Sequence, residues 1–141
     1  MLHTPGHTPE SICLLITDRS RGPEPWFLLT GDTLFVGSVG RPDLPGSAEA
    51  SARERYRSLY CTIMPLPDTI EIYPAHISGS VRGASISGKP ASTLGSEKRF
   101  NPLLSFISEA ECVQAITKDA LPKPGEMTEI LAHKEGRAQL L

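Results

Sequence analysis

Three polar residues stand where predicted strands or turns end. His7 follows a Pro-Gly turn near the start of the chain, and Asp32 and His76 follow apolar segments with the pattern of β-strands. Imidazole and carboxylate groups are ligands for zinc and iron, and strand ends hold them rigidly while loops leave coordination positions open. Gly6 and Gly31, each directly before one of them, let the backbone approach closely in a crowded pocket. The three residues are therefore candidate metal ligands.

Each candidate also has a purely structural interpretation. A single histidine is commonly a hydrogen-bonded structural group, and an aspartate after a glycine is commonly a turn residue. Spacing alone leaves both interpretations open for His7, Asp32 and His76. We interpret His3, at the chain start, and His133, in a polar helical segment, as structural or solvent-exposed.

The predicted strands are short and separated by turns. Residues 11–17 form a nearly unbroken apolar run, which predicts a strand covered on both faces. Residues 26–30 form a second run, and the Gly- and Pro-rich turn between the two predicts a β-hairpin. Residues 69–73 alternate like a strand and lead directly toward His76.

Helical patterns follow the strands. From Ser47, a plausible N-cap, apolar residues recur at helical spacing as far as Ile63, before Pro65 and Pro67. Residues 77–96 predict a long Ser/Gly-rich loop. Further helices are predicted at 102–107, 109–116 and 127–133. Strands followed by helices, without repeats, predict an α/β layered domain.

Length and composition fit one domain over residues 1–141. The chain is 39% hydrophobic and 21% charged, with a formal charge of −2, so it has no basic field that would attract nucleic acid. No apolar run approaches the roughly 20 residues of a membrane span. Three widely spaced cysteines predict neither a disulfide framework nor a zinc knuckle and suit a reducing cytoplasm.

Three ordered segments resemble the later metal motifs of the metallo-β-lactamase superfamily. They are residues 2–8 (LHTPGHT), 30–35 (TGDTLF) and 73–76 (YPAH). Further segments resemble persulfide dioxygenases, including bacterial forms fused to rhodanese domains. These are residues 40–44 (GRPDL), 92–95 (STLG), 97–102 (EKRFNP) and 121–124 (LPKP). The resemblance implies an α/β fold that is the C-terminal half of an αββα sandwich.

The resemblance also implies roles for individual residues. His7, Asp32 and His76 match metal ligands, with His76 on the second metal of dinuclear members. Asp32, as the carboxylate ligand, is also the expected catalytic residue. Arg41 matches an arginine beside the thiol-substrate pocket of the dioxygenases, and its alternative interpretation is a solvated loop charge.

The sequence departs from the family pattern in three ways. The signature H-x-H-x-D-H, which lies in the N-terminal half and supplies most ligands, does not occur in these 141 residues. Ser38 stands where rhodanese-fused relatives carry Asp, and Arg82 stands where they carry Cys. We therefore expect an incomplete metal site.

The resemblance implies two kinds of chemistry. A mononuclear iron site would oxidise a glutathione-type persulfide to sulfite, which is the function we favour. A dinuclear zinc site would hydrolyse thioesters, as in glyoxalase II. The third alternative is a non-catalytic fragment that self-associates or is complemented by a missing N-terminal half. Whichever alternative holds, half of a sandwich lacks its partner sheet, so we expect exposed apolar surface within 12–16 or at Leu28 and Leu29.

Overall fold

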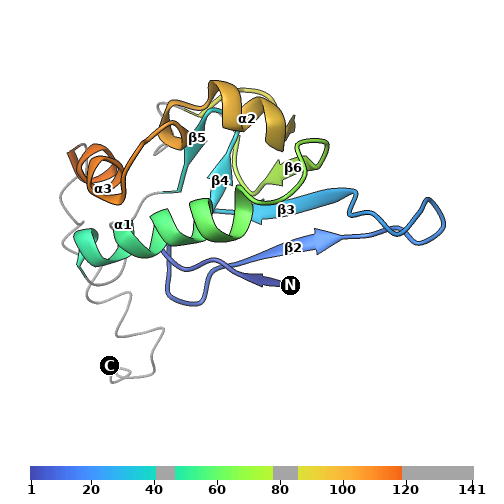
Figure 1. Ribbon diagram of the computed structural model, residues 1–141, viewed down its shortest axis with the longest axis horizontal. Coiled ribbons are helices and arrows are strands. Elements are labelled where there is room, and N and C mark those ends of the chain that lie inside the picture. The colour runs from blue at the N-terminus through green and yellow to red at the C-terminus, as the bar shows by residue number, and fades with distance from the viewer. Residues whose placement is uncertain (41–46, 78–85, 119–141) are drawn as a thin grey trace, which may run out of the picture.

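A five-stranded sheet is the frame of the protein in this computed structural model, which describes residues 1–40, 47–77 and 86–118 (Figure 1). Its strands, in spatial order, are β1 (Leu2–His3), β2 (Ile12–Ile16), β3 (Phe27–Gly31), β6 (Glu71–Pro74) and β7 (Ser92–Thr93). A separate two-stranded sheet contains β4 (Leu34–Phe35) and β5 (Ser38–Val39). The helical segments are α1 (Ala48–Arg57), η1 (Ser58–Ile63), α2 (Leu94–Phe100), η2 (Pro102–Leu104) and α3 (Glu109–Lys118). The predicted α/β class is confirmed.

The pairing of β2, β3 and β6 decides where the candidate ligands lie. β2 and β3 form the predicted antiparallel hairpin, with Leu15 opposite Leu28. β3 runs parallel to β6, with Leu28 opposite Ile72. Because the two strands are parallel, their carboxyl ends meet at one edge of the sheet. Asp32 and the segment leading to His76 leave the sheet at that edge.

One face of the sheet is packed and the other is open. Cys13, Leu28 and Ile72 are fully buried and belong to a core cluster with Leu59 and Ile63 of η1. Leu94 of α2 and Leu104 of η2 join the same cluster. The helical segments therefore pack on one face of the strands.

The open face corrects the prediction that residues 11–17 are covered on both sides. Within β2, Ile12 is 42% and Leu14 is 38% exposed, while Cys13 between them is buried. Leu29 of β3 and Tyr73 of β6 are exposed on the same face, because Leu14 pairs with Leu29 and Leu29 pairs with Tyr73. The expected exposure of apolar surface is thus confirmed for this face, but Leu28 points the other way and is buried.

The predicted helix from Ser47 to Ile63 is present as two joined segments. Ser47 caps α1, accepting a hydrogen bond from the Ala50 backbone N–H, and the chain continues as the π-helical turn η1. Glu49 and Arg53 form the i,i+4 ion pair that this spacing allows, at 2.9 Å. None of the helices that the structure describes is long and apolar enough to cross a membrane.

Two C-terminal predictions need correction. The long loop predicted over 77–96 ends early, because Ser92 pairs with Ile72 to form β7 and Thr93 caps α2. The helix predicted over 102–107 is only the short 3-10 segment η2. The helix over 109–116 is confirmed as α3. The one predicted over 127–133 lies outside the described residues.

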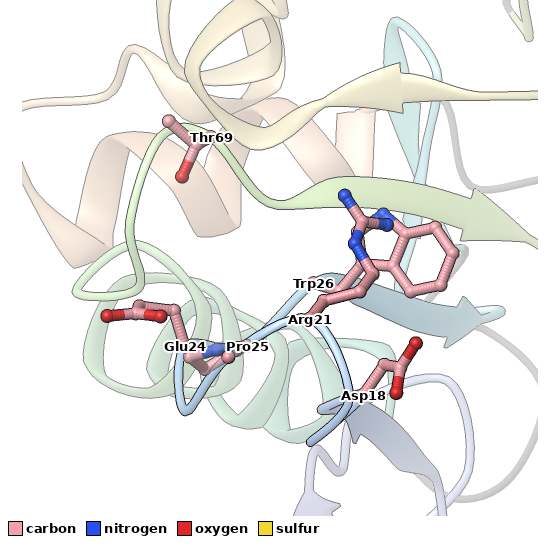
Figure 2. A pocket seen from close by; sticks show the side chains of 7 residues that line it. Asp18, Arg21, Glu24, Pro25, Trp26 and Thr69 are labelled. Carbon is pink, nitrogen blue, oxygen red and sulfur yellow. The ribbon is translucent and has the colours of Figure 1, made fainter.

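An open pocket lies at the amino ends of β3 and β6 (Figure 2). Its volume is about 240 Å³, and Arg21 stacks over the Trp26 ring at 3.8 Å from the centroid. The other lining residues are Asp18, Gly22, Glu24, Pro25 and Thr69. Trp26 precedes β3 and Thr69 precedes β6, so this pocket is at the opposite end of these strands from Asp32 and His76.

Candidate metal centre

His7 is held by a tight loop between β1 and β2. The Gly6 φ of +132° is accessible mainly to glycine. A Cβ on Gly6 would lie 2.6 Å from the Arg55 Cα, so this loop is packed directly against α1. Across the loop, the Thr8 N–H donates to the Ser11 Oγ at 3.0 Å. These contacts fix the backbone from which the His7 side chain extends.

Asp32 begins the turn between β3 and β4. Gly31 has a φ of +52°, which lets the chain turn sharply at the end of β3. The Thr33 N–H donates to the Thr30 carbonyl at 2.9 Å, and the Thr30 hydroxyl donates to the Leu34 carbonyl at 2.6 Å. Thr30 and Thr33 are both buried. The turn is therefore pinned from inside the protein while the Asp32 side chain points outward.

His76 leaves the carboxyl end of β6 beside Asp32. The Ala75 N–H donates to the Gly31 carbonyl at 3.0 Å and holds the two strand ends together. The His76 ring packs edge-on against Phe35, with 6.1 Å between ring centroids.

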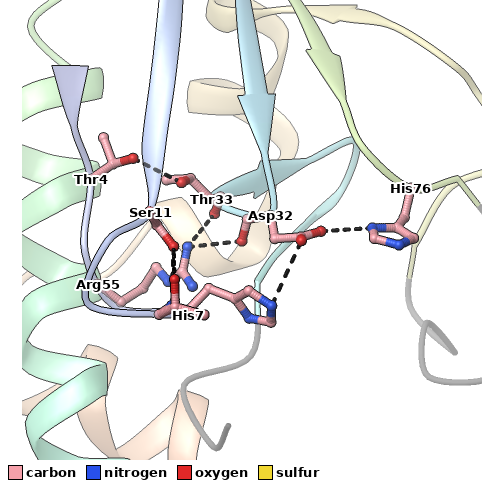
Figure 3. Close-up of polar contacts among 8 residues, drawn as sticks. Thr4, His7, Ser11, Asp32, Thr33, Arg55 and His76 are labelled. Atoms are coloured by element: carbon pink, nitrogen blue, oxygen red, sulfur yellow. Dashed lines mark hydrogen bonds and ion pairs between the residues drawn. The ribbon is translucent and has the colours of Figure 1, made fainter. Parts of the chain in front are cut away.

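The three predicted residues meet on one rim, with the Asp32 carboxylate between the two imidazoles (Figure 3). Asp32 Oδ1 lies 2.6 Å from His76 Nδ1, and Asp32 Oδ2 lies 3.7 Å from His7 Nε2. The side chains are partly exposed: 19% for His7, 30% for Asp32 and 51% for His76. An ionised carboxylate only accepts hydrogen bonds, so the His76 Nδ1–H is the donor. Proximity is thus as predicted, whereas metal ligation stays a prediction.

The distance between His7 Nε2 and Asp32 Oδ2 fits a shared metal ion better than the distance between His76 Nδ1 and Asp32 Oδ1 does. Two ligand atoms bonded to one tetrahedral zinc lie roughly 3.4 Å apart. The separation of His7 and Asp32 is close to that value, and the separation of His76 and Asp32 is that of a hydrogen bond. No group of three or more His, Cys, Asp or Glu among the described residues is arranged to hold a metal ion. The donor set thus fits two ligands, His7 and Asp32, with His76 orienting the carboxylate.

A buried polar layer behind the rim was not foreseen from the sequence. Arg55 is fully buried, and its Nη1 donates to the carbonyls of Asp32 and Thr33, each at 3.0 Å. The Thr4 and Thr33 hydroxyls share a hydrogen bond of 3.0 Å, which links the two ligand-bearing segments. Helical spacing carried a signal for Arg55: it lies three residues after Ala52 and four before Leu59, both buried.

A second buried polar pair supports the β4–β5 hairpin. The Glu97 Oε2 accepts hydrogen bonds from the Gly37 N–H at 2.8 Å and from the Asn101 amide at 3.1 Å. The Asn101 amide also donates to the Ser38 carbonyl at 3.1 Å. This pair fixes the chain just before Gly40. Arg41, the predicted substrate-binding residue, lies outside the described residues, and its role stays a prediction.

Comparisons with known proteins agree with this architecture. No family model matches the chain. A solved metallo-beta-lactamase from Staphylococcus aureus aligns with 99% of this chain and 40% of its own, at TM-score 0.84 and 40% identity. The structure of ETHE1 from Myxococcus xanthus aligns with 97% of this chain and 53% of its own, at TM-score 0.72 and 29% identity. The mitochondrial persulfide dioxygenase ETHE1 of Bos taurus is 32% identical over 124 residues, 88% of this chain and 42% of its own length.

The likeness covers nearly all of this chain but less than half of the curated relative just named. The solved neighbours share the arrangement of the sheet and helices described above. The structural neighbours of this chain are metallo-β-lactamase-fold proteins, and its neighbours in sequence and structure include the persulfide dioxygenase ETHE1.

Proposed function

We propose that this chain forms part of a persulfide dioxygenase-like enzyme, in which His7 and Asp32 hold iron. The observation that carries the proposal is the placement of the Asp32 carboxylate, 3.7 Å from His7 Nε2 and hydrogen-bonded to His76. The likeness to ETHE1 supports the choice of reaction. The substrate would be a glutathione-type persulfide, which O₂ and water convert to sulfite and the free thiol.

The metal would need at least one donor more than these two. When bound, iron held by two imidazoles and a carboxylate supplies open positions for a persulfide and O₂. This chain contributes one imidazole and the carboxylate, and another histidine would come from a segment like the H-x-H-x-D-H motif. Asp32 is suited to its role because His76 Nδ1–H fixes one carboxylate oxygen and leaves the other directed toward His7.

Arg41 would bind the substrate. A guanidinium directs its donors to anionic groups such as carboxylates, which a glutathione-type molecule carries. Gly40, the residue before Arg41 in the sequence, is buried and directly follows β5.

A zinc hydrolase of the glyoxalase II type is the second candidate. The favouring observation is that the Asp32 carboxylate lies between two imidazoles, so His7, Asp32 and His76 would together hold a dinuclear zinc site if His76 turned to the metal. Such a zinc site would supply an activated water for the hydrolysis of a thioester. A non-catalytic role is the third candidate, since so few ligands bind a metal weakly.

The open sheet face supports completion by further polypeptide. Ile12, Leu14, Leu29 and Tyr73 form exposed apolar surface on adjacent strands. Such a face favours burial against another sheet or a second copy of the chain. We propose an N-terminal half as its partner, with self-association when that half is absent.

The decisive experiment joins this chain to an N-terminal segment that carries an H-x-H-x-D-H motif. We expect the joined protein to bind iron stoichiometrically, to consume O₂ with glutathione persulfide and to release sulfite. Arg41→Ala should leave the metal bound and raise KM. Thioester hydrolysis without O₂ uptake would instead assign the hydrolase function. Bound metal without either activity would support the non-catalytic alternative, and full activity of the short chain would contradict its incompleteness.

A further inference from the structure

A fully buried guanidinium stands behind the candidate metal centre (Figure 3). We propose that Arg55 is a positioning residue that sets the spacing of His7 and Asp32 by fixing both of their backbone segments against α1. The inference rests on the proposed metal-binding role of these two residues. Among the described residues, the hydrogen bonds of Arg55 go to backbone carbonyls and not to the side-chain atoms of His7 and Asp32 that would bind the metal.

The contact with the Asp32 segment is direct. A single nitrogen, Nη1, donates to two consecutive carbonyls, those of Asp32 and Thr33, at 3.0 Å each. The first of these carbonyls belongs to the residue whose carboxylate forms the rim. Holding two successive peptide groups leaves the Asp32 backbone little freedom to rotate, so the direction of its side chain is fixed from behind.

The contact with the His7 segment comes from the same part of α1. Gly6, directly before His7, packs on the Arg55 backbone so closely that an added Cβ would lie 2.6 Å from both its N and Cα. One helical turn further, the Ser58 hydroxyl donates to the Pro5 carbonyl at 2.7 Å. Residues three apart share a helix face. This face therefore touches the loop that carries His7 and the turn that carries Asp32.

Fold stability alone gives a weak reason for a guanidinium at this place. The Nε and Nη2 atoms of Arg55 are buried and have no hydrogen-bond partner among the residues that the structure describes. Burying a charged guanidinium whose N–H groups lack partners costs free energy. An apolar side chain of similar length would fill the space without that cost, and such replacements of buried charges are often neutral or stabilising. The two carbonyl contacts behind Asp32 are what methionine would not supply.

The test uses Arg55→Met, with Arg55→Lys as the conservative variant that keeps a charged donor. Arg57→Met is the matched control, because Arg57 lies on the same helix but its side chain is 69% exposed. Circular dichroism melts on the full chain establish that each variant is folded. If Arg55→Met does not fold, Arg55→Gln, which keeps a neutral donor, takes its place against Arg55→Lys.

The first readout needs no metal. At about pH 8, neutral imidazole carries its proton on one nitrogen, and long-range ¹H–¹⁵N correlations report which one. Asp32 should hold the His76 proton on Nδ1 in the native chain and in Arg57→Met. In Arg55→Met, the His76 tautomer that carries its proton on Nε2 should become more populated. In Arg55→Lys, the Nδ1–H tautomer should again predominate. A folded Arg55→Met or Arg55→Gln chain with the native tautomer would overturn the proposal.

The second readout is a Co²⁺ titration followed by paramagnetic shifts of the His7 ring signals. We expect Arg55→Met to bind Co²⁺ at least about tenfold more weakly, because removing a group that holds a metal ligand in place usually lowers metal affinity by that much. Arg55→Lys should recover part of the affinity. The proposal would also be overturned if the loss of Co²⁺ affinity in each variant were explained by the fraction of that variant that is unfolded. If the joined protein binds no Co²⁺, the proposed function fails, while the tautomer readout on the native chain still decides the role of Arg55.

Discussion

The two ends of the parallel strands β3 and β6 differ in how their polar groups are supported. At the amino ends lies an open pocket of about 240 Å³. Its Arg21 stacks on the exposed Trp26 ring, and its Asp18 accepts a hydrogen bond from the Ser20 hydroxyl in the same turn. At the carboxyl ends, the Asp32 carboxylate sits between two imidazoles, and a buried layer containing Arg55 stands behind it.

This difference shows that a pocket in the surface and a set of rigidly positioned polar side chains need not occur at the same place. The pocket at the amino ends has volume, but its Asp18 is held by local contacts within its own turn. The carboxyl ends, where ligands bind in open α/β sheets, have side chains fixed by contacts between distant segments. Perturbing each end in turn tests whether the support is specific to one of them.

The largest effect on stability should come from Gly6→Ala. The added Cβ would meet the Arg55 backbone at 2.6 Å, and the φ of +132° disfavours alanine, so we expect a loss of about 2–4 kcal/mol in the free energy of unfolding. Gly37→Ala is the control: its φ is +78° but nothing lies within 4 Å, so it should lose only about 1 kcal/mol. Equal losses in urea denaturation would show that Gly6 is not specially packed.

His76→Ala should weaken metal binding rather than folding. It removes the hydrogen bond that orients Asp32, and we expect about tenfold lower metal affinity with unchanged stoichiometry. The melting temperature should hardly move, because His76 is 51% exposed. Metal analysis of the joined protein would contradict the mononuclear assignment if the variant lost one of two bound ions.

A smaller effect, confined to alkaline pH, should come from Cys13 in the layer behind Asp32. Burial raises the pKa of the Cys13 thiol above its ordinary value of 9.0, and hydrogen bonds from Thr4 and Thr33 oppose part of that rise. The folded state therefore keeps a proton that the unfolded state loses. Stability is fully present below about pH 9 and falls as the pH rises through the folded pKa. Cys13→Ala should flatten this slope in denaturation measured from pH 8 to pH 11.

The smallest effect should come from Arg21→Ala at the amino ends. Its contact with Trp26 is exposed, so we expect a loss of about 0.5–1 kcal/mol and no change in metal affinity. Co²⁺ titration of this variant completes the comparison. A weakened metal site would mean that the two ends are coupled through β3.

Residues next to strand ends could be predicted because their signal is local. His7, Asp32 and His76 follow turns or apolar runs that the sequence displays directly, and the runs at 11–17 and 26–30 indicate the hairpin. Parallel pairing of β3 with β6 then brings Asp32 and His76 together.

Other features depend on contacts between distant segments. β7 has two residues, and it exists because Ser92 pairs with Ile72 twenty positions away, which a Ser/Gly-rich sequence does not reveal. Arg55 and Glu97 carry charges, and charged residues are mostly exposed, whereas these two are buried against backbone carbonyls or N–H groups. The open face of β2 cannot be predicted from the sequence, because an unbroken apolar run does not show which face of a strand lacks a cover.

The most direct test of the metal-centre assignment is Co²⁺ binding by the native chain, Asp32→Ala and Asp18→Ala. Each variant removes one aspartate carboxylate, at opposite ends of β3 and β6, so a difference in Co²⁺ affinity between the two variants cannot come from the change in net charge. We predict that Asp32→Ala abolishes the paramagnetic shifts of the His7 ring and that Asp18→Ala leaves them unchanged. Equal Co²⁺ affinity in the native chain and Asp32→Ala would contradict the assignment of this rim as a metal centre.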